Sequence, residues 1–238
     1  MANIKTALIT GASRGLGLAL ARVLAQQGWR LLINGRNAQQ LLKAYNELNN
    51  STEVIAISGD VRDEIHLLQL QEALANNNWT LDLVVNNAST LGASPLVPLL
   101  DHPVNALHSV FHTNIIAPIS LIQKVTGYLS PHATIINISS DAAKAAYPNW
   151  GAYSSSKAGL DHLTAILAAE NPQWHIYAFD PGDMRTDMHQ AAFPGEDISD
   201  RPKPEEQALP AILQLVQLQP ESSRYTAAEL MAKARASA

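Results

Sequence analysis

The sequence lacks cysteine altogether and has few aromatic residues: none of its 238 residues is cysteine, and 5% are aromatic. Without cysteine, neither a disulfide framework nor a metal site built from thiolates is possible. No hydrophobic run approaches the ~18 residues of a membrane-spanning helix. Residues 1–5 lead directly into a strand pattern, without the layout of a signal peptide. We therefore expect a cytoplasmic protein with no membrane partner.

The chain also lacks a cluster of basic residues. Its formal net charge is -5, and acidic and basic residues are mixed along it. A nucleic-acid-binding protein would present a clustered basic face, so we expect no nucleic-acid partner. His108 and His112 have a spacing seen in metal-binding helices, but no third ligand matches it, so we expect no metal site. Hydrophobic residues make up 47% of the sequence, enough for the core of one α/β domain over residues 1–238.

Short apolar strands alternate with segments of helical periodicity. The expected strands are residues 6–10, 30–34, 54–57, 81–85, 133–138 and 174–179, with a short one near 224–225. The longer expected helices cover residues 38–48, 65–75, 105–129, 153–170 and 204–219. This alternation predicts an α/β, Rossmann-type, doubly wound, mostly parallel sheet of six to seven strands with helices on both faces. Ligands of such sheets bind beyond the carboxyl ends of the strands, where Gly11, Arg36, Asp60, Asn87, Ser140 and Pro181 fall.

A glycine-rich turn, Gly11-Ala-Ser-Arg-Gly-Leu-Gly17, joins the first strand to the first helix. Glycine permits a tight turn and a close approach of the backbone to a pyrophosphate, whose charge is favoured at a helix N-terminus. The same residues could also form an ordinary glycine turn. The strand before the turn and the helix after it favour the dinucleotide-binding interpretation.

Polar residues after the next strands offer further contacts, each with a simpler alternative. Arg36 stands where a dinucleotide fold selects its cofactor, and an arginine there suits a 2′-phosphate; it could instead be a solvated turn residue. Asp60 could accept a hydrogen bond from an adenine amine, cap the following helix, or do both. Asn86 and Asn87 could bridge neighbouring strands through their amides, or lie in a surface turn.

Tyr153 and Lys157 are four residues apart in a helical pattern, which places the phenol and the amine on one face of the helix. A nearby ammonium favours the phenolate and lowers the pKa of the tyrosine. A general acid works best when its pKa approaches the operating pH. Ser140 ends the preceding strand, where its hydroxyl could bind a substrate oxygen. Alone, such a pair is more often an ordinary surface Tyr and Lys, and the residues at the other strand ends favour the catalytic interpretation.

With these residues the chain resembles the short-chain dehydrogenase/reductase family over nearly its whole length. The matching motifs, in the family's order, are Thr10-Gly-x-x-x-Gly-x-Gly17, Asp60-Val61, Asn86-Asn87-Ala88, Asn114, Ser140, Tyr153-x-x-x-Lys157 and Pro181-Gly182. The stretch from Asn171 to Met188 is locally similar to the sepiapterin reductase branch. The chain departs from the family pattern at Ser89, where glycine is usual, and lacks the usual glycine-rich ending of the last strand.

The resemblance implies a catalytic tetrad. Tyr153 would donate and accept the proton, Lys157 would lower its pKa and bond the nicotinamide ribose, Ser140 would hold the substrate carbonyl oxygen, and Asn114 would support a water that relays protons. The cofactor would contact Gly11, Ser13, Arg14, Gly15, Leu16, Gly17, Arg36, Asp60, Val61, Asn86, Asn87, Ala88, Tyr153, Lys157, Pro181, Gly182, Met184 and Thr186. The resemblance also implies a homodimer or homotetramer, with the helices around 105–129 and 153–170 packed between subunits.

We therefore predict an NADP(H)-dependent oxidoreductase that transfers a hydride between nicotinamide and a carbonyl or secondary alcohol substrate. Arg14 and Arg36 flank the expected adenosine ribose, and no acid near position 36 is available to bond the ribose of NAD. One alternative is a cofactor-binding regulatory protein without turnover, which would not need the tetrad. Another is a sugar-nucleotide epimerase or dehydratase, which the glycine spacing and the absence of a substrate domain after residue 238 disfavour.

Three segments remain outside the expected strands and helices. Residues 183–204 form a long polar stretch, which in a compact domain is typical of a substrate lid. Residues 90–103 and 183–204, the expected walls of the substrate pocket, lack a basic cluster for a strongly anionic carrier, which favours a small neutral carbonyl compound. Residues 230–238 are alanine-rich, and we expect this tail to fray.

Overall fold

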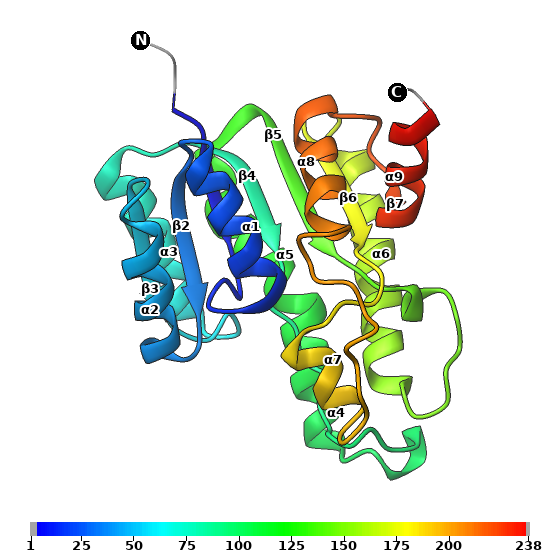
Figure 1. Cartoon of the computed structure of the whole chain (residues 1–238). Helices are drawn as coiled ribbons and strands as arrows, with labels where there is room; N and C mark the ends of the chain where they lie inside the picture. Colours follow the sequence, from blue (N-terminus) through cyan, green and yellow to red (C-terminus); the bar gives the residue numbers. More distant parts are fainter. Residues whose placement is uncertain (1–3, 237–238) are drawn as a thin grey trace.

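A computed structural model describes residues 4–236 and shows a seven-stranded sheet in which every neighbouring pair of strands is parallel (Figure 1). The strands are β1 (Thr6–Ile9), β2 (Arg30–Gly35), β3 (Val54–Ser58), β4 (Leu81–Asn86), β5 (Leu129–Ile138), β6 (His175–Asp180) and β7 (Arg224–Thr226). Their order across the sheet is β3-β2-β1-β4-β5-β6-β7. The order reverses direction between β1 and β4, and ligands of open parallel sheets bind at such a point.

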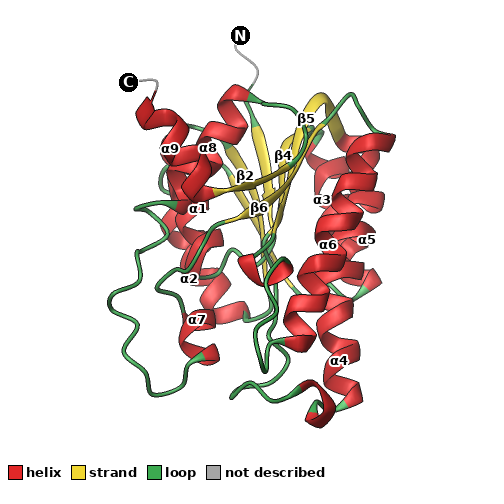
Figure 2. Cartoon of the chain, turned by 90° about the vertical axis from the view of Figure 1, so that its right-hand side faces the viewer, coloured by secondary structure: helices red, strands yellow, loops and turns green. Residues whose placement is uncertain are grey.

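Helices cover both faces of the sheet, as the alternating pattern predicts (Figure 2). One face carries α1 (Gly15–Gln26), α2 (Ala38–Leu48), α8 (Ala208–Leu218) and α9 (Ala227–Ala236); the other carries α3 (Glu64–Asn77), α5 (Ala117–Val125) and α6 (Gly151–Glu170). Beyond the carboxyl ends of the strands lie α4 (Val104–Phe111) and α7 (Asp187–Ala192). Each strand of the centre contributes side chains to both layers, which explains why these strands read as nearly continuous apolar runs.

Local hydrogen bonds set where the helices begin. Asn37 caps α2 by accepting from the amide of Gln40, and Asp63 caps α3 by accepting from the amide of Ile65. The possibility that Asp60 caps this helix is therefore wrong. Asp63 takes the position because its side chain reaches the free amides of the first turn. By contrast, α1 begins with no side-chain cap and no acidic residue in its first turn, so its first amides face the space beyond the strand ends.

The segment expected as one helix over 105–129 is helical but not uniform. A π-helical turn (His112–Ile116) separates α4 from α5, and a 3-10 turn (Thr126–Tyr128) follows α5. Pro118 has no amide hydrogen to donate to the carbonyl of Asn114, four residues earlier. The helix is therefore interrupted near Asn114 by this π-helical turn, a feature that is common at functional sites.

Two boundaries differ from the sequence-based expectation. The fifth strand begins at Leu129 instead of residue 133, because the register of its pairing with β4 shifts between Leu81 and Leu83 and an irregular extension pairs with Leu81. The tail expected to fray from residue 230 continues as α9 to Ala236, because Leu230 is buried in the core. Residues 237–238 lie outside the described part of the chain.

Arg224, at the start of the short edge strand β7, ties the end of the sheet to the helix behind it. Its guanidinium pairs with Asp161 of α6 at 2.9 Å and with Asp180 at the end of β6 at 3.0 Å. It also donates to the carbonyl oxygen of Ser140 at 3.0 Å. The side chains of Asp161 and Asp180 are 9% and 7% exposed, so Arg224 compensates two nearly buried carboxylates.

We expect Arg224→Met to lower the free energy of unfolding by about 3–5 kcal/mol, because removing one partner leaves buried charges unpaired. Burial already raises the pKa of Asp180, although Gly182 and Arg224 oppose that effect. Loss of the arginine should raise this pKa further. Because protonation of Asp180 then relieves the unpaired charge, the loss of stability should shrink as the pH is lowered. Urea unfolding at several pH values measures both effects.

The matched control is Arg22→Met. Arg22 pairs with Glu47 on the surface, where both side chains are more than 40% exposed. Exposed pairs contribute about 0–1 kcal/mol, so this variant should unfold nearly as the unchanged protein does. Equal destabilisation by the two substitutions would show that Arg224 is not a structural tie.

Candidate active site

The glycine-rich turn lies directly over the end of β4. Gly11 and Gly15 have φ angles of +65° and +55°, in the left-handed region that glycine adopts without a steric penalty. Gly17 has no such angle and is needed for space: a Cβ there would lie 2.6 Å from both Asn87 Nδ2 and the carbonyl oxygen of Gly11. The turn therefore packs closely against Asn87 and leaves the first amides of α1 free.

Side-chain amides join the ends of the central strands, as expected for Asn86 and Asn87. The Asn87 amide donates to the carbonyl oxygens of Thr10 and Gly11, at 2.9 and 3.1 Å. The Asn86 amide donates to Asn137 Oδ1 of β5 at 2.7 Å. The alternative of a surface turn is wrong for Asn86, which is 4% exposed. These bonds hold the glycine-rich turn and the two central strands in one arrangement.

The pocket continues from the glycine turn past β2 and β3. Arg36 and Asp60 both line it, and the positive charge of Arg36 helps to lower the pKa of Asp60. The largest cause of that lowered pKa is the hydrogen bond from Arg62, which approaches Asp60 Oδ2 at 2.7 Å. Among residues 4–236, no ion pair holds the guanidinium of Arg36. The two flanking arginines differ in this respect, because Arg14 pairs with Asp187 of α7 at 2.8 Å.

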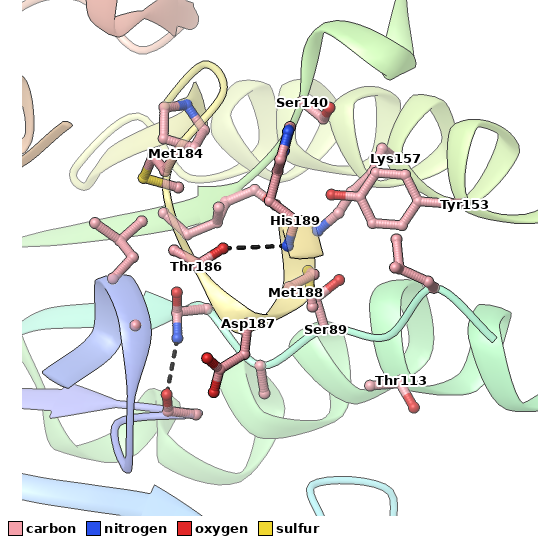
Figure 3. A pocket seen from close by; sticks show the side chains of 18 of the residues that line it. Ser89, Thr113, Ser140, Tyr153, Lys157, Met184, Thr186, Asp187, Met188 and His189 are labelled. Carbon is pink, nitrogen blue, oxygen red and sulfur yellow. Dashed lines mark hydrogen bonds between the residues drawn. The ribbon is translucent and has the colours of Figure 1, made fainter. Parts of the chain in front are cut away.

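Ser140, Tyr153 and Lys157 meet at the other end of the pocket (Figure 3). The amine of Lys157 donates to the carbonyl oxygen of Ile138 at 2.6 Å and lies 5.5 Å from the centre of the Tyr153 ring. Figure 3 shows the Tyr153 hydroxyl and the Lys157 amine pointing toward the same part of the pocket. Ser140 Oγ accepts from the amide of Ala142 at 3.2 Å and donates to Asp141 at 2.9 Å.

Burial shifts the pKa of both groups toward their neutral forms. It lowers the pKa of Lys157 to about 8, and the negative charge of Asp161 opposes this effect. It also raises the pKa of Tyr153, although a hydrogen bond with Ser140 acts in the opposite direction. The expectation that the pKa of Tyr153 is lowered is therefore wrong for this structure. The loss of hydration at the phenol outweighs any favourable charge, and the carboxylates of Asp180 and Asp141 add to the increase.

Asn114 stands behind the catalytic helix with its side chain fully hydrogen-bonded. Its oxygen accepts from Ser89 Oγ at 3.1 Å and from the amide of Thr90 at 2.9 Å. Its nitrogen donates to the carbonyl oxygen of Thr90 at 3.0 Å and to Ser156 Oγ at 2.9 Å. Ser89, which replaces the usual family glycine, thus gains a partner. The side-chain amide of Asn114 is therefore fully used, and Pro118 cannot donate to the main-chain carbonyl oxygen of Asn114.

One cavity of about 830 Å³ contains most of the predicted site residues. The predicted residues that line it are Gly11, Ser13, Arg14, Gly15, Leu16, Arg36, Asp60, Val61, Asn87, Ala88, Ser140, Tyr153, Lys157, Pro181, Gly182, Met184 and Thr186. Gly17, Asn86 and Asn114 are not in its wall: each supports the wall from behind through the contacts described above. This volume is within the usual range of ligand pockets, roughly 300–1,000 Å³.

Sequence reasoning predicted two segments of the wall opposite the cofactor turn, residues 90–103 and 183–204, but not which of their residues line it, and it missed Asp141 and Trp150. Leu91, Trp150, Met188 and Phe193 pack around Tyr153 there, and Asp141 lies beside Ser140. These residues come from three loops and from α7, so no periodic pattern marks them. The one available signal was position, because Asp141 directly follows the serine at the end of β5.

Comparison with known proteins identifies this arrangement. A family model described as short chain dehydrogenase matches residues 5–197. The chain belongs to the short-chain dehydrogenase/reductase family. Within residues 4–236 no helix is long and apolar enough to cross a membrane, and no group of three or more His, Cys, Asp or Glu side chains is placed to hold a metal.

Individual family members share about a quarter to a third of their residues with this chain. An uncharacterized oxidoreductase of Escherichia coli K12, YciK, is 28% identical over 207 residues, which cover 82% of this chain and 79% of the relative. Sepiapterin reductase of Bos taurus is 30% identical over 201 residues, covering 78% and 74%. A short-chain dehydrogenase of Shigella flexneri 2a strain 301, solved in complex with NADP, is 26% identical and superimposes with a TM-score of 0.87, covering 94% and 97%.

The close contact at Gly17 generates a prediction. We expect Gly17→Ala to weaken binding of a dinucleotide by at least about tenfold and to lower the free energy of unfolding by ~1–3 kcal/mol, because the added methyl group displaces Asn87 from a well-packed site. Fluorescence titration with NADPH and thermal unfolding measure the two effects.

The matched control is Gly127→Ala. A Cβ at Gly127 would meet nothing within 4 Å, so this variant should fold and bind like the unchanged protein. Normal NADPH binding by the Gly17→Ala variant would show that the turn does not lie against the cofactor.

Proposed function

We propose that the protein is an NADP(H)-dependent oxidoreductase that interconverts a carbonyl compound and the corresponding alcohol. The observation that carries this proposal is that Ser140, Tyr153 and Lys157 share one cavity with the uncapped N-terminus of α1. An anion at the glycine turn and a carbonyl at Tyr153 would then lie at two ends of the same space. The NADP bound by the Shigella flexneri relative supports the choice of cofactor.

The residues present fit a dinucleotide phosphate. The first turn of α1 has no side-chain cap and no acid, so its amides are free to bind an anion. A Cβ at Gly11 would lie 3.0 Å from Ala88 Cα and from Asn87 Nδ2, so the turn has no room for a side chain on that side. Gly11, Ser13 and Gly15 would hold the pyrophosphate, Asp60 and Val61 the adenine, and Arg36 the 2′-phosphate. When bound, the nicotinamide supplies or accepts the hydride.

Tyr153 acts as the proton donor during reduction. Burial keeps its pKa above the ordinary value, so the phenol holds its proton at neutral pH. It can give this proton to the carbonyl oxygen as hydride addition turns that oxygen into an alkoxide, because an alkoxide is a stronger base than a phenolate. To hold that oxygen, the hydroxyl of Ser140 turns its one proton away from Asp141, and the contact between Ser140 and Tyr153 brings both hydroxyl groups to the same atom.

Lys157 has a second role at the cofactor. An ammonium has three N–H donors, and the one acceptor seen among the described residues is the carbonyl oxygen of Ile138. The remaining donors are available for the hydroxyls of the nicotinamide ribose. The Asn114 carbonyl is the group that we propose for a proton-relaying water.

The remaining expectations belong to the same proposal. Residues 183–204 act as a lid over the substrate end of the pocket, where Met188 and Phe193 pack against Leu91 and Trp150.

A homodimer or homotetramer is supported by exposed apolar side chains on and near α4 and α6, those of Val104, Phe111, Ile116 and Ile166. The small residues of α6 make contacts within the chain: Ser156 accepts from Asn114, and Gly159 leaves room for the side chain of Ile115. Cytoplasmic location stays a prediction from the sequence.

We expect Tyr153→Phe to reduce carbonyl reduction by about 10²–10⁴-fold while leaving NADPH binding nearly unchanged, because only the proton donor is lost. Lys157→Ala should weaken both the rate and NADPH binding, because the amine has two roles. Oxidation of NADPH with a panel of ketones, aldehydes and pterins, together with fluorescence titration of NADPH, separates rate from binding. Near-normal turnover by the phenylalanine variant would rule out this mechanism, and cofactor binding without reduction of any compound of the panel by the unchanged protein would favour the regulatory alternative.

We expect a preference for NADPH over NADH on the order of tenfold to a hundredfold, because Arg36 is free to bind a phosphate while Arg14 is held by Asp187. Arg36→Gln should abolish the preference, and Arg36→Asp should reverse it by repelling the phosphate and accepting from the ribose hydroxyls. The ratio of kcat/KM for the two cofactors, at low and high salt, measures this. A ratio near one in the unchanged protein would show that Arg36 points into solvent.

A further inference from the structure

The carboxylates of the cavity wall differ in their partners. Five aspartates line the cavity, and four of them pair with an arginine: Asp60 with Arg62, Asp180 with Arg224, Asp183 with Arg201 and Asp187 with Arg14. Asp141 is the exception, because within residues 4–236 no cationic side chain lies within 4.0 Å of its carboxylate. The one negative charge of this wall that the protein does not neutralise therefore lies next to Ser140.

Neutral donors hold the carboxylate of Asp141 in one orientation. Its Oδ1 accepts from Ser140 Oγ at 2.9 Å and from the amide of Ala142 at 2.8 Å. Its Oδ2 accepts from the hydroxyl of Tyr147 at 2.8 Å, and this bond is the largest cause of the raised pKa of Tyr147. Because each carboxylate oxygen has more than one acceptor position, Asp141 can still bind a further donor.

Aromatic rings line the same cavity as this carboxylate. The ring of Trp150 lies 5.7 Å from that of Tyr153 and 5.9 Å from that of Phe193, between ring centres. All three residues line the cavity, together with Tyr147. Aromatic faces attract cations, and a carboxylate beside such rings is a favourable site for an ammonium group. Among residues 4–236, Lys157 is the cationic side chain near these rings, 5.5 Å from the centre of the Tyr153 ring, and none lies within 4.0 Å of the Asp141 carboxylate.

We propose that Asp141, with Trp150 and Phe193, selects substrates that carry a cationic nitrogen one or two carbon atoms from the reacting carbonyl. This inference rests on the proposed function, because Ser140 must hold the carbonyl oxygen. The substrate class is then an amino ketone or amino aldehyde. Its carbonyl carbon gains a hydride from NADPH and its oxygen gains a proton from Tyr153, which yields an amino alcohol and NADP⁺. The small neutral carbonyl compound favoured by the sequence becomes the less preferred substrate.

The test uses two ketones of the same shape that differ in charge. Phenacyltrimethylammonium carries a permanent positive charge, and neopentyl phenyl ketone has carbon in place of its nitrogen. Binding of each to the full-length protein holding NADP⁺ is measured by calorimetry. We expect the cation to bind about tenfold more tightly to the unchanged protein. Asp141→Asn keeps the shape and the acceptor oxygen of the side chain and should bring the ratio of affinities close to one.

Asp183→Asn is the matched control, since it removes a carboxylate of the same cavity that already has an arginine partner; the tenfold ratio should persist. Equal binding of the two ketones, no binding of the cation, or an unchanged ratio in Asp141→Asn would overturn the proposal. So would an equal loss of both ketones in Asp141→Asn, which would show that Asp141 only positions Ser140.

Failure of the proposed function is distinguishable from failure of this inference. If NADPH is oxidised with the neutral ketone but the cation has no advantage, the protein is a reductase and the selection by charge is wrong. If the cation binds selectively and no carbonyl compound of the panel is reduced, the charge selection holds and the reductase function is wrong.

Discussion

The rest of the site depends on hydrogen bonds of side-chain amides at the carboxyl ends of the strands; the amides of Asn34 and Asn137 are buried. Three side-chain amides link neighbouring segments. Those of Asn34 and Asn137 both donate and accept, and that of Asn87 donates twice. Asn34 accepts from the amide of Gly11 at 3.4 Å and donates to the carbonyl oxygen of Gly59 at 3.0 Å. A buried amide without such partners would cost about 1–3 kcal/mol, so each one fits only when its neighbours are in place. The edge of the sheet is therefore specified as a unit.

Hydrogen bonds and ion pairs at this edge also hold the two halves of the cavity in a fixed relative position. The Asn137 amide donates to Thr164 of α6 at 2.9 Å, so β5 and the helix that carries Tyr153 are tied together. On the far side, Arg224 pairs with Asp161 of the same helix. Residues 183–204 are attached more weakly, through exposed pairs such as Arg14 with Asp187, each contributing about 0–1 kcal/mol. This difference in attachment supports the proposal that residues 183–204 act as a lid.

The sequence predicted the fold well because parallel strands and their helices follow a periodic pattern. The residues at the strand ends were also predictable, because parallel strands bring their carboxyl ends to one edge. Asp141 and Trp150 were not, because loops carry no periodicity and their contacts depend on tertiary packing. The sequence also left undecided which residue caps α3, because Asp60 and Asp63 are equally good caps and only the structure shows which side chain Arg62 holds. The pKa of Tyr153 was mispredicted because spacing reports the nearby charge but not the loss of water around the phenol.

The loss of water around a buried polar group costs stability, and for Lys157 this cost follows from the change in its pKa. Its pKa falls from 10.5 to about 8 on folding. A lysine whose pKa is lower in the folded state than in the unfolded state lowers the stability of the fold. The cost appears as the pH falls below the pKa of the unfolded state, and it is complete below the pKa of the folded state. At neutral pH this amounts to about 3 kcal/mol. The fold keeps an ammonium that is 2% exposed and that has one acceptor among the described residues, the carbonyl oxygen of Ile138. A charge retained at that cost, with donors left over, is best explained by a ligand that accepts from it.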